Sequence, residues 1–189
     1  MTEPSLTITE YRNNAIYEVY QAPIYSTDPR QWSALEFLNA LSEHPNAEFN
    51  FADWKEQRGY PLIHATALTL EYAAAQTSRI VTALSDLQQT FYVIPTQENA
   101  TLFLFPLEQP VKSYRTIRRA ASLIAEYLEA DGLTPNSYLP SHRFKLRPDL
   151  PIHYREGELL RAETMLKEAT GILTKIERFS VNNSVKMTE

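Results

Sequence analysis

The residues of this 189-residue chain with the clearest chemical potential are basic ones, and they gather in its second half. Residues 1–110 contain 5 Lys/Arg and 13 Asp/Glu, whereas residues 111–189 contain 13 Lys/Arg and 10 Asp/Glu. Residues 112–147 alone hold seven basic and three acidic side chains. Clustered cations attract anionic groups such as phosphates and carboxylates. The charge pattern therefore predicts an anionic partner, and it indicates no particular reaction.

Four of these bases lie near the start of a predicted helix, and they are Lys112, Arg115, Arg118 and Arg119. The start of a helix carries a positive partial charge, so an exposed cation there costs about 0.3–1 kcal/mol. An anion would interact favourably with both the free N–H groups and the guanidinium groups. A nucleic-acid phosphate and an acidic protein surface are both candidates. The alternative is that these bases pair with the acidic first half of the same chain.

Arg143, Lys145 and Arg147 alternate with Phe144 and Leu146 in the segment that follows. In an extended conformation the three bases would share one face, while the two apolar side chains would lie on the other. Such a strand could follow a phosphate backbone, or it could be an edge strand that charges protect from aggregation. Because this segment comes after the predicted helix, we expect all seven bases to form one anion-facing surface.

The sequence offers little for catalysis. His64 and Glu71 could form an acid–base pair if they shared a helix face, although a lone histidine is more often structural. Nucleophile, zinc-protease and phosphate-loop motifs are absent, and four histidines and no cysteine give no metal-ligand spacing and no disulfide. No catalytic residue, metal or cofactor is predicted. We therefore expect a non-catalytic binding or assembly subunit of a larger complex, with a cofactor-free enzyme using His64 and Glu71 as the competing interpretation.

Hydrophobic residues make up 43% of the chain and charged residues 22%, which is typical of a globular protein. Alternating β-branched and aromatic residues predict two hairpins, and apolar residues spaced by three and four predict four helices. The hairpins span residues 5–20 and 90–105, and the helices span 30–43, 62–87, 112–130 and 156–179. The fold class is therefore α+β, with an antiparallel sheet built from two hairpins and packed by about four helices.

Several finer expectations follow from the same patterns. Asp28 should cap the first helix, with Pro29 at its first position. Tyr114 should face inward on the helix over 112–130. The aromatic hairpin over 90–105 could offer a base-stacking platform, but both of its faces are apolar, which favours burial.

The prolines after residue 131 predict a division of the chain into a core, a connector and an appended helix. The expected boundaries are 1–131 for the α+β core, 132–154 for a basic Pro-rich connector, 155–180 for an amphipathic helix and 181–189 for a flexible tail. The apolar stripe of the last helix could pack on the core or join two copies of the chain. With no signal peptide and no membrane span, we expect a cytoplasmic protein whose partner is a protein or a nucleic acid.

Overall fold

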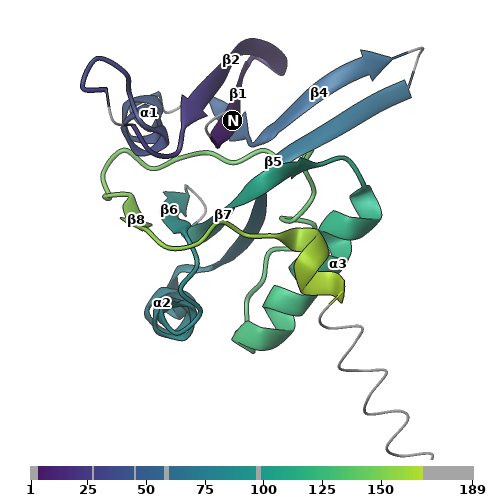
Figure 1. Ribbon diagram of the computed structural model, residues 1–189. Helices are drawn as coiled ribbons and strands as arrows, with labels where there is room; N and C mark the ends of the chain where they lie inside the picture. Colours follow the sequence, from purple (N-terminus) through teal and green to yellow (C-terminus); the bar gives the residue numbers. More distant parts are fainter. Residues whose placement is uncertain (1–3, 27, 45, 58–59, 97–98, 168–189) are drawn as a thin grey trace, which may run out of the picture.

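The computed structural model describes residues 4–26, 28–44, 46–57, 60–96 and 99–167 of the chain. In this part of the chain, eight strands form two antiparallel sheets, and helices pack around them (Figure 1). The α+β class and the antiparallel pairing predicted from the sequence are confirmed.

The smaller sheet contains the first predicted hairpin. Its strand order is β2-β1-β3, with β1 at Ser5–Arg12, β2 at Ala15–Pro23 and β3 at Glu48–Asn50. Asn13 and Asn14 connect β1 to β2 with φ angles of 51° and 62°. A two-residue hairpin turn requires such positive φ angles at both positions, and asparagine tolerates them well.

Helix α1 (Ala34–Leu41) lies on the same side of the molecule as this sheet (Figure 1). Ser33 caps it in a reciprocal arrangement with Glu36, because each side chain accepts a hydrogen bond from the other's backbone. The prediction that Asp28 and Pro29 start the helix is wrong. The Asp28 carboxylate instead accepts a hydrogen bond from the Arg30 N–H at 2.9 Å within the preceding loop.

The larger sheet has the strand order β4-β5-β7-β6-β8. Its strands are β4 (Ala52–Gln57), β5 (Tyr60–Ala73), β6 (Phe91–Thr96), β7 (Ala100–Val111) and β8 (His153–Arg155). Strands β6 and β7 form the second predicted hairpin, with Tyr92 opposite Leu104. Both hairpins therefore exist, but they lie in different sheets instead of forming one sheet together.

The predicted helix over residues 62–87 is wrong over most of its length. Strand β5 runs to Ala73, the short 3-10 helix η1 covers Ala74–Gln76, and helix α2 covers only Thr77–Ser85. In β5, Leu68, Leu70 and Tyr72 point to one face of the sheet with a period of two. Residues 65–72 of this strand are buried on both faces, and most of them are apolar or small. A helical spacing could therefore be found by chance in this segment.

The larger sheet is the central layer of the molecule. One face packs against α2 and α3 (Tyr114–Leu128), and the other packs against the smaller sheet and α1 (Figure 1). In the hairpin β6–β7, Phe91 and Phe105 belong to the first core cluster, whereas Tyr92 and Leu104 belong to the second. All four are almost completely buried, so the expectation that this aromatic hairpin is internal is confirmed.

The connector after α3 links the two sheets. Phe144 forms an isolated bridge with Phe49 of the smaller sheet, and Leu146 forms one with Thr96 of the larger sheet. The expected short strand around residues 143–146 is therefore reduced to single pairings. Residues 156–161 contain two isolated bridges and no helix, and residues 162–167 are helical, so the predicted helix starts later than expected. Residues 168–180 and the predicted tail lie outside the described residues.

Candidate anion-binding surface

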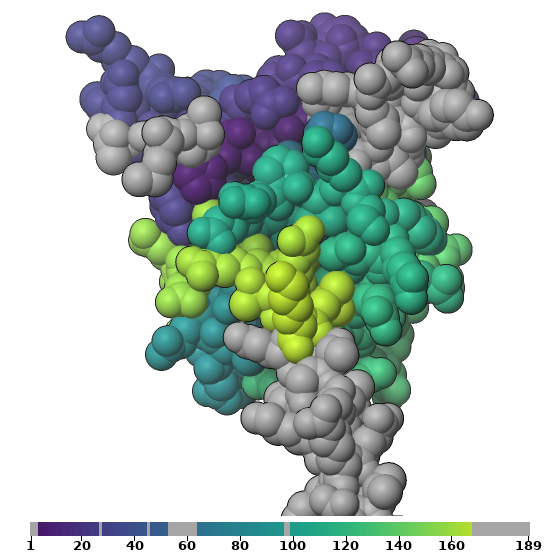
Figure 2. All heavy atoms as spheres, turned by 45° about the vertical axis from the view of Figure 1, so that its right-hand side comes forward, coloured from purple at the N-terminus to yellow at the C-terminus, as the bar shows by residue number. Residues whose placement is uncertain are grey.

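Helix α3 presents its basic side chains to solvent because its other face is fixed in the core. Five apolar residues are buried against the larger sheet, namely Ile117, Ala120, Ala121, Ile124 and Leu128. Ser113 caps the helix by accepting a hydrogen bond from the Thr116 N–H at 3.3 Å. Arg115, Arg118 and Arg119 occupy the opposite, exposed side, and Lys112 is exposed just before the cap. Figure 2 shows this side of the molecule, with the green atoms of α3 beside the yellow-green residues that precede position 168.

These four cations have no carboxylate partner within the described ranges of the chain. The first turn of α3 also contains no acidic residue. The alternative interpretation, pairing with the acidic first half of the chain, is therefore not observed for this group. An anion brought to this helix would meet several positive side chains that form no ion pair with a described residue.

Tyr114 adds an aromatic ring to the same surface. The sequence pattern placed it inward, but it lies at the first helical position and is 44% exposed. The interaction of its hydroxyl with the Tyr138 side chain raises the pKa of Tyr114, while the nearby Arg118 acts in the opposite direction. Its four-residue separation from Arg118 was the signal in the sequence that places both on one helix face.

The connector cations are held differently. Arg143 donates a hydrogen bond to the Asn14 Oδ1 atom at 2.6 Å, and its guanidinium group lies 3.9 Å from the centroid of the Tyr11 ring. It is thus attached to the first hairpin. Arg147 forms an ion pair with Asp149 at 2.8 Å, which lowers the pKa of the Asp149 carboxyl group. Lys145 is exposed between them.

The seven predicted cations therefore form two groups. The α3 group lies over the first core cluster, whereas Phe144 and Leu146 anchor the connector cations to the second cluster. That both groups act as one surface stays a prediction. Within each group the exposure agrees with the sequence. The α3 cations are exposed, and in the connector Phe144 and Leu146 are buried while Lys145 between them is exposed.

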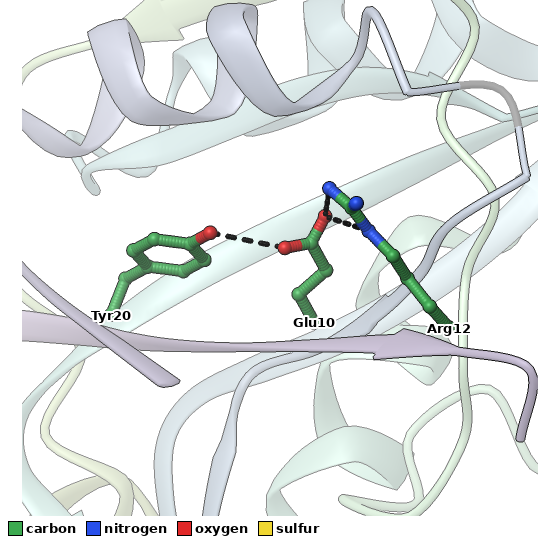
Figure 3. Close-up of polar contacts among 3 residues, drawn as sticks. All are labelled: Glu10, Arg12 and Tyr20. Atoms are coloured by element: carbon green, nitrogen blue, oxygen red, sulfur yellow. Dashed lines mark hydrogen bonds and ion pairs between the residues drawn. The ribbon is translucent and has the colours of Figure 1, made fainter. Parts of the chain in front are cut away.

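A charged cluster that the sequence did not suggest lies inside the smaller sheet. Glu10 is completely buried, yet it accepts hydrogen bonds from Tyr20 at 3.0 Å and from Arg12 at 3.0 and 3.3 Å (Figure 3). The Arg12 guanidinium group also lies 3.7 Å from the centroid of the Tyr17 ring. The hydrogen bonds that Arg12 and Tyr20 donate to Glu10 compensate the cost of burying its carboxylate. In the sequence, the two-residue spacing of Glu10 and Arg12 was the one indication that both side chains lie on the same face of a strand.

The competing acid–base pair is wrong. His64 and Glu71 both lie on β5, seven residues apart in an extended strand. At a rise of roughly 3.3 Å per residue, their backbones are about 23 Å apart, too far for a shared proton transfer. Glu71 is buried and accepts a hydrogen bond from the Thr96 hydroxyl at 2.9 Å.

Two kinds of site are absent from the described residues. They contain no group of three or more His, Asp or Glu side chains placed to hold a metal ion. No helix in the same part of the chain is long and apolar enough to cross a membrane.

Comparison with known proteins identifies no family, because no protein-family model and no curated protein match this chain. Two solved structures match this chain. The AEP domain of the primase-polymerase (PrimPol) of cyanophage S-2L is 12% identical, with a TM-score of 0.44 over 87% of this chain and 88% of that one. The polymerase domain of Mycobacterium tuberculosis ligase D, in complex with DNA, is 14% identical, with a TM-score of 0.34 over 67% of this chain and 56% of that one.

These likenesses bear on one prediction. The matched chains are named as the AEP domain of a primase-polymerase and as a polymerase domain, so the expectation of a non-catalytic binding or assembly subunit is withdrawn. At these identities and TM-scores they assign no activity to this chain.

Proposed function

We propose that this protein binds nucleic acid and contacts its phosphates with the cations of α3. The observation that carries the proposal is the exposed array of Arg115, Arg118 and Arg119, preceded by Lys112, with no carboxylate partner among the described residues. Guanidinium groups bind phosphate through paired hydrogen bonds, and a cluster of them on one face is the electrostatic signature of such an interface.

The spacing of the array suits a phosphate backbone. Arg115 and Arg119 are separated by about 6 Å along the helix axis, at a rise of roughly 1.5 Å per residue. Successive phosphates of one stacked strand are about 3.4 Å apart along the duplex axis, so the array covers about two such steps. Several phosphates can therefore be contacted together, and each contact releases a condensed counterion.

The test is charge reversal at two exposed positions, Arg118→Glu and Arg119→Glu together. We expect binding of a fluorescently labelled DNA oligonucleotide, followed by anisotropy at low salt, to weaken by at least about 100-fold, since two contacts are replaced by repulsion. For the unaltered protein, the affinity should fall steeply with salt, with a log–log slope of about −2 to −3 for three or four phosphate contacts.

A matched control changes the net charge equally at exposed positions away from this helix, and the double variant Arg30→Glu/Arg79→Glu provides it. We expect the control to bind nearly as well as the unaltered chain, and we expect both double variants to unfold at the same urea concentration. Equal loss of binding in both variants would show that only net charge matters, which contradicts the proposed site. No binding of the unaltered chain to DNA or RNA at low salt contradicts the function itself.

A further inference from the structure

Tyr114 is an exposed aromatic residue at the start of α3, in the same first turns as the α3 cations. Its side chain is 44% exposed, so part of the ring is free for contact. Its hydroxyl interacts with the side chain of Tyr138, and Tyr138 is partly buried against the first core cluster. A ring that is exposed but restrained loses less conformational entropy when it contacts a ligand. The side chain is therefore preorganised at the surface.

The arginines of α3 lie to one side of this ring around the helix. At 100° per residue, Arg118 lies 40° from Tyr114 around the axis, and Arg115 and Arg119 continue the same arc. Tyr127 is the useful contrast, because it is 48% exposed on the same helix but lies outside this arc. It donates a hydrogen bond to the Ala83 carbonyl oxygen at 3.4 Å, and the acidic residues Glu126 and Glu129 lie within two positions of it in the chain.

We propose that Tyr114 stacks on an unpaired base, and that the preferred ligand of the α3 surface is single-stranded nucleic acid. This inference rests on the proposed function and extends it to a class of ligand. An aromatic ring beside guanidinium groups is the combination that single-strand binding requires, with cations following the backbone and the ring receiving a base. In a duplex the base faces are already stacked on one another, so the ring would have no partner there.

The experiment compares two single-stranded probes that have the same phosphates. One is a labelled oligothymidylate of about 16 nucleotides, and the other is the same backbone with abasic sites throughout. We expect Tyr114→Ala to weaken binding of the oligothymidylate by roughly 5- to 150-fold, the effect of losing one stacked base. Binding of the abasic probe should stay unchanged, because it depends on phosphate contacts alone. Tyr114→Phe, which keeps the ring, should retain most of the affinity.

Two further variants separate the possible outcomes. Tyr127→Ala removes an equally exposed tyrosine from the same helix and should bind both probes as the unaltered chain does. Arg118→Ala should weaken both probes alike. If Tyr114→Ala binds the oligothymidylate normally, or loses both probes equally, the stacking inference is overturned while the proposed function stands. If the unaltered chain binds neither probe and no duplex, both the function and the inference are overturned.

Discussion

Arg12 and the arginines of α3 use the same type of side chain in opposite ways. Arg12 lies against the buried carboxylate of Glu10, whose second oxygen accepts a hydrogen bond from Tyr20. Arg118 and Arg119 are exposed and have no carboxylate partner among the residues that the structure describes. Arg12 donates hydrogen bonds to the buried carboxylate of Glu10 and so contributes to the fold. The α3 arginines leave their charge available to a ligand.

Because of this difference, mutations of the Glu10 cluster should change stability, whereas mutations of the α3 arginines should change binding affinity. A buried carboxylate cannot lose its donors without leaving polar groups unsatisfied, so changes there act on folding. Exposed cations without partners contribute little to folding, so changes there act on affinity. Three predictions test this contrast, beginning with the largest expected effect.

The first prediction concerns Glu10. We expect Glu10→Ala to lower the free energy of unfolding by about 2–4 kcal/mol, because it leaves a cavity and an unpaired Tyr20 hydroxyl. Urea unfolding followed by tyrosine and tryptophan fluorescence measures this change. Affinity for the oligothymidylate should change by less than about twofold at a temperature where the variant is folded, since Glu10 lies in a different sheet from the one that α3 covers.

Glu18 provides the matched control for this variant. It lies directly opposite Glu10 in the β1–β2 register, but it is exposed. Glu18→Ala should therefore change stability by no more than about 0.5 kcal/mol. If the two variants destabilise the protein equally, burial of the Glu10 carboxylate is not what makes this cluster structurally important.

The second prediction concerns pH. Burial and, next, the hydrogen bond to Glu10 raise the pKa of Tyr20 to about 12. Between pH 10 and pH 12 the unfolded chain loses this proton while the folded chain keeps it, so stability must fall as the pH rises. Burial also raises the pKa values of Tyr92 and Tyr154, which act in the same direction.

Tyr20→Phe isolates the contribution of Tyr20, because phenylalanine cannot ionise. We expect the loss of stability between pH 10 and pH 12 to be smaller in this variant, by on the order of 1–2 kcal/mol. Urea midpoints measured at both pH values give the difference. Parallel pH profiles for the variant and the unaltered chain would show that Tyr20 keeps an ordinary pKa in the folded protein.

The third prediction has the smallest expected effect and concerns the connector. Arg143 lies over the Tyr11 ring and is bonded to Asn14, so Arg143→Ala should cost about 0.5–1 kcal/mol of stability. Its effect on oligothymidylate affinity should be below about twofold if α3 carries the binding. An affinity loss as large as that of Arg118→Ala would instead show that the connector cations and the α3 cations bind the ligand together, as the single surface predicted from the sequence.

The sequence by itself determined the features that depend on local periodicity and charge. The turn at Asn13 and Asn14 follows from their tolerance of positive φ angles. The hairpin around Tyr92 and Leu104 follows from its apolar strands, and the exposed cations of α3 follow from its strongly one-sided apolar pattern. The α+β class and the antiparallel pairing were therefore predictable, because neighbouring residues in the chain decide them.

The features that depend on contacts between distant segments were decided by the tertiary structure. Residues 62–73 lie in a strand whose residues 65–72 are buried on both faces, which removes the alternation of polar and apolar residues that identifies strands. The separation of His64 from Glu71, and the division of the cations into two groups, depend on that strand and on where the connector crosses. Burial of Glu10 depends on donors that the fold supplies, and Tyr114 is held by Tyr138 from another segment. Contacts between distant segments have no local signature, so only the folded chain reveals them.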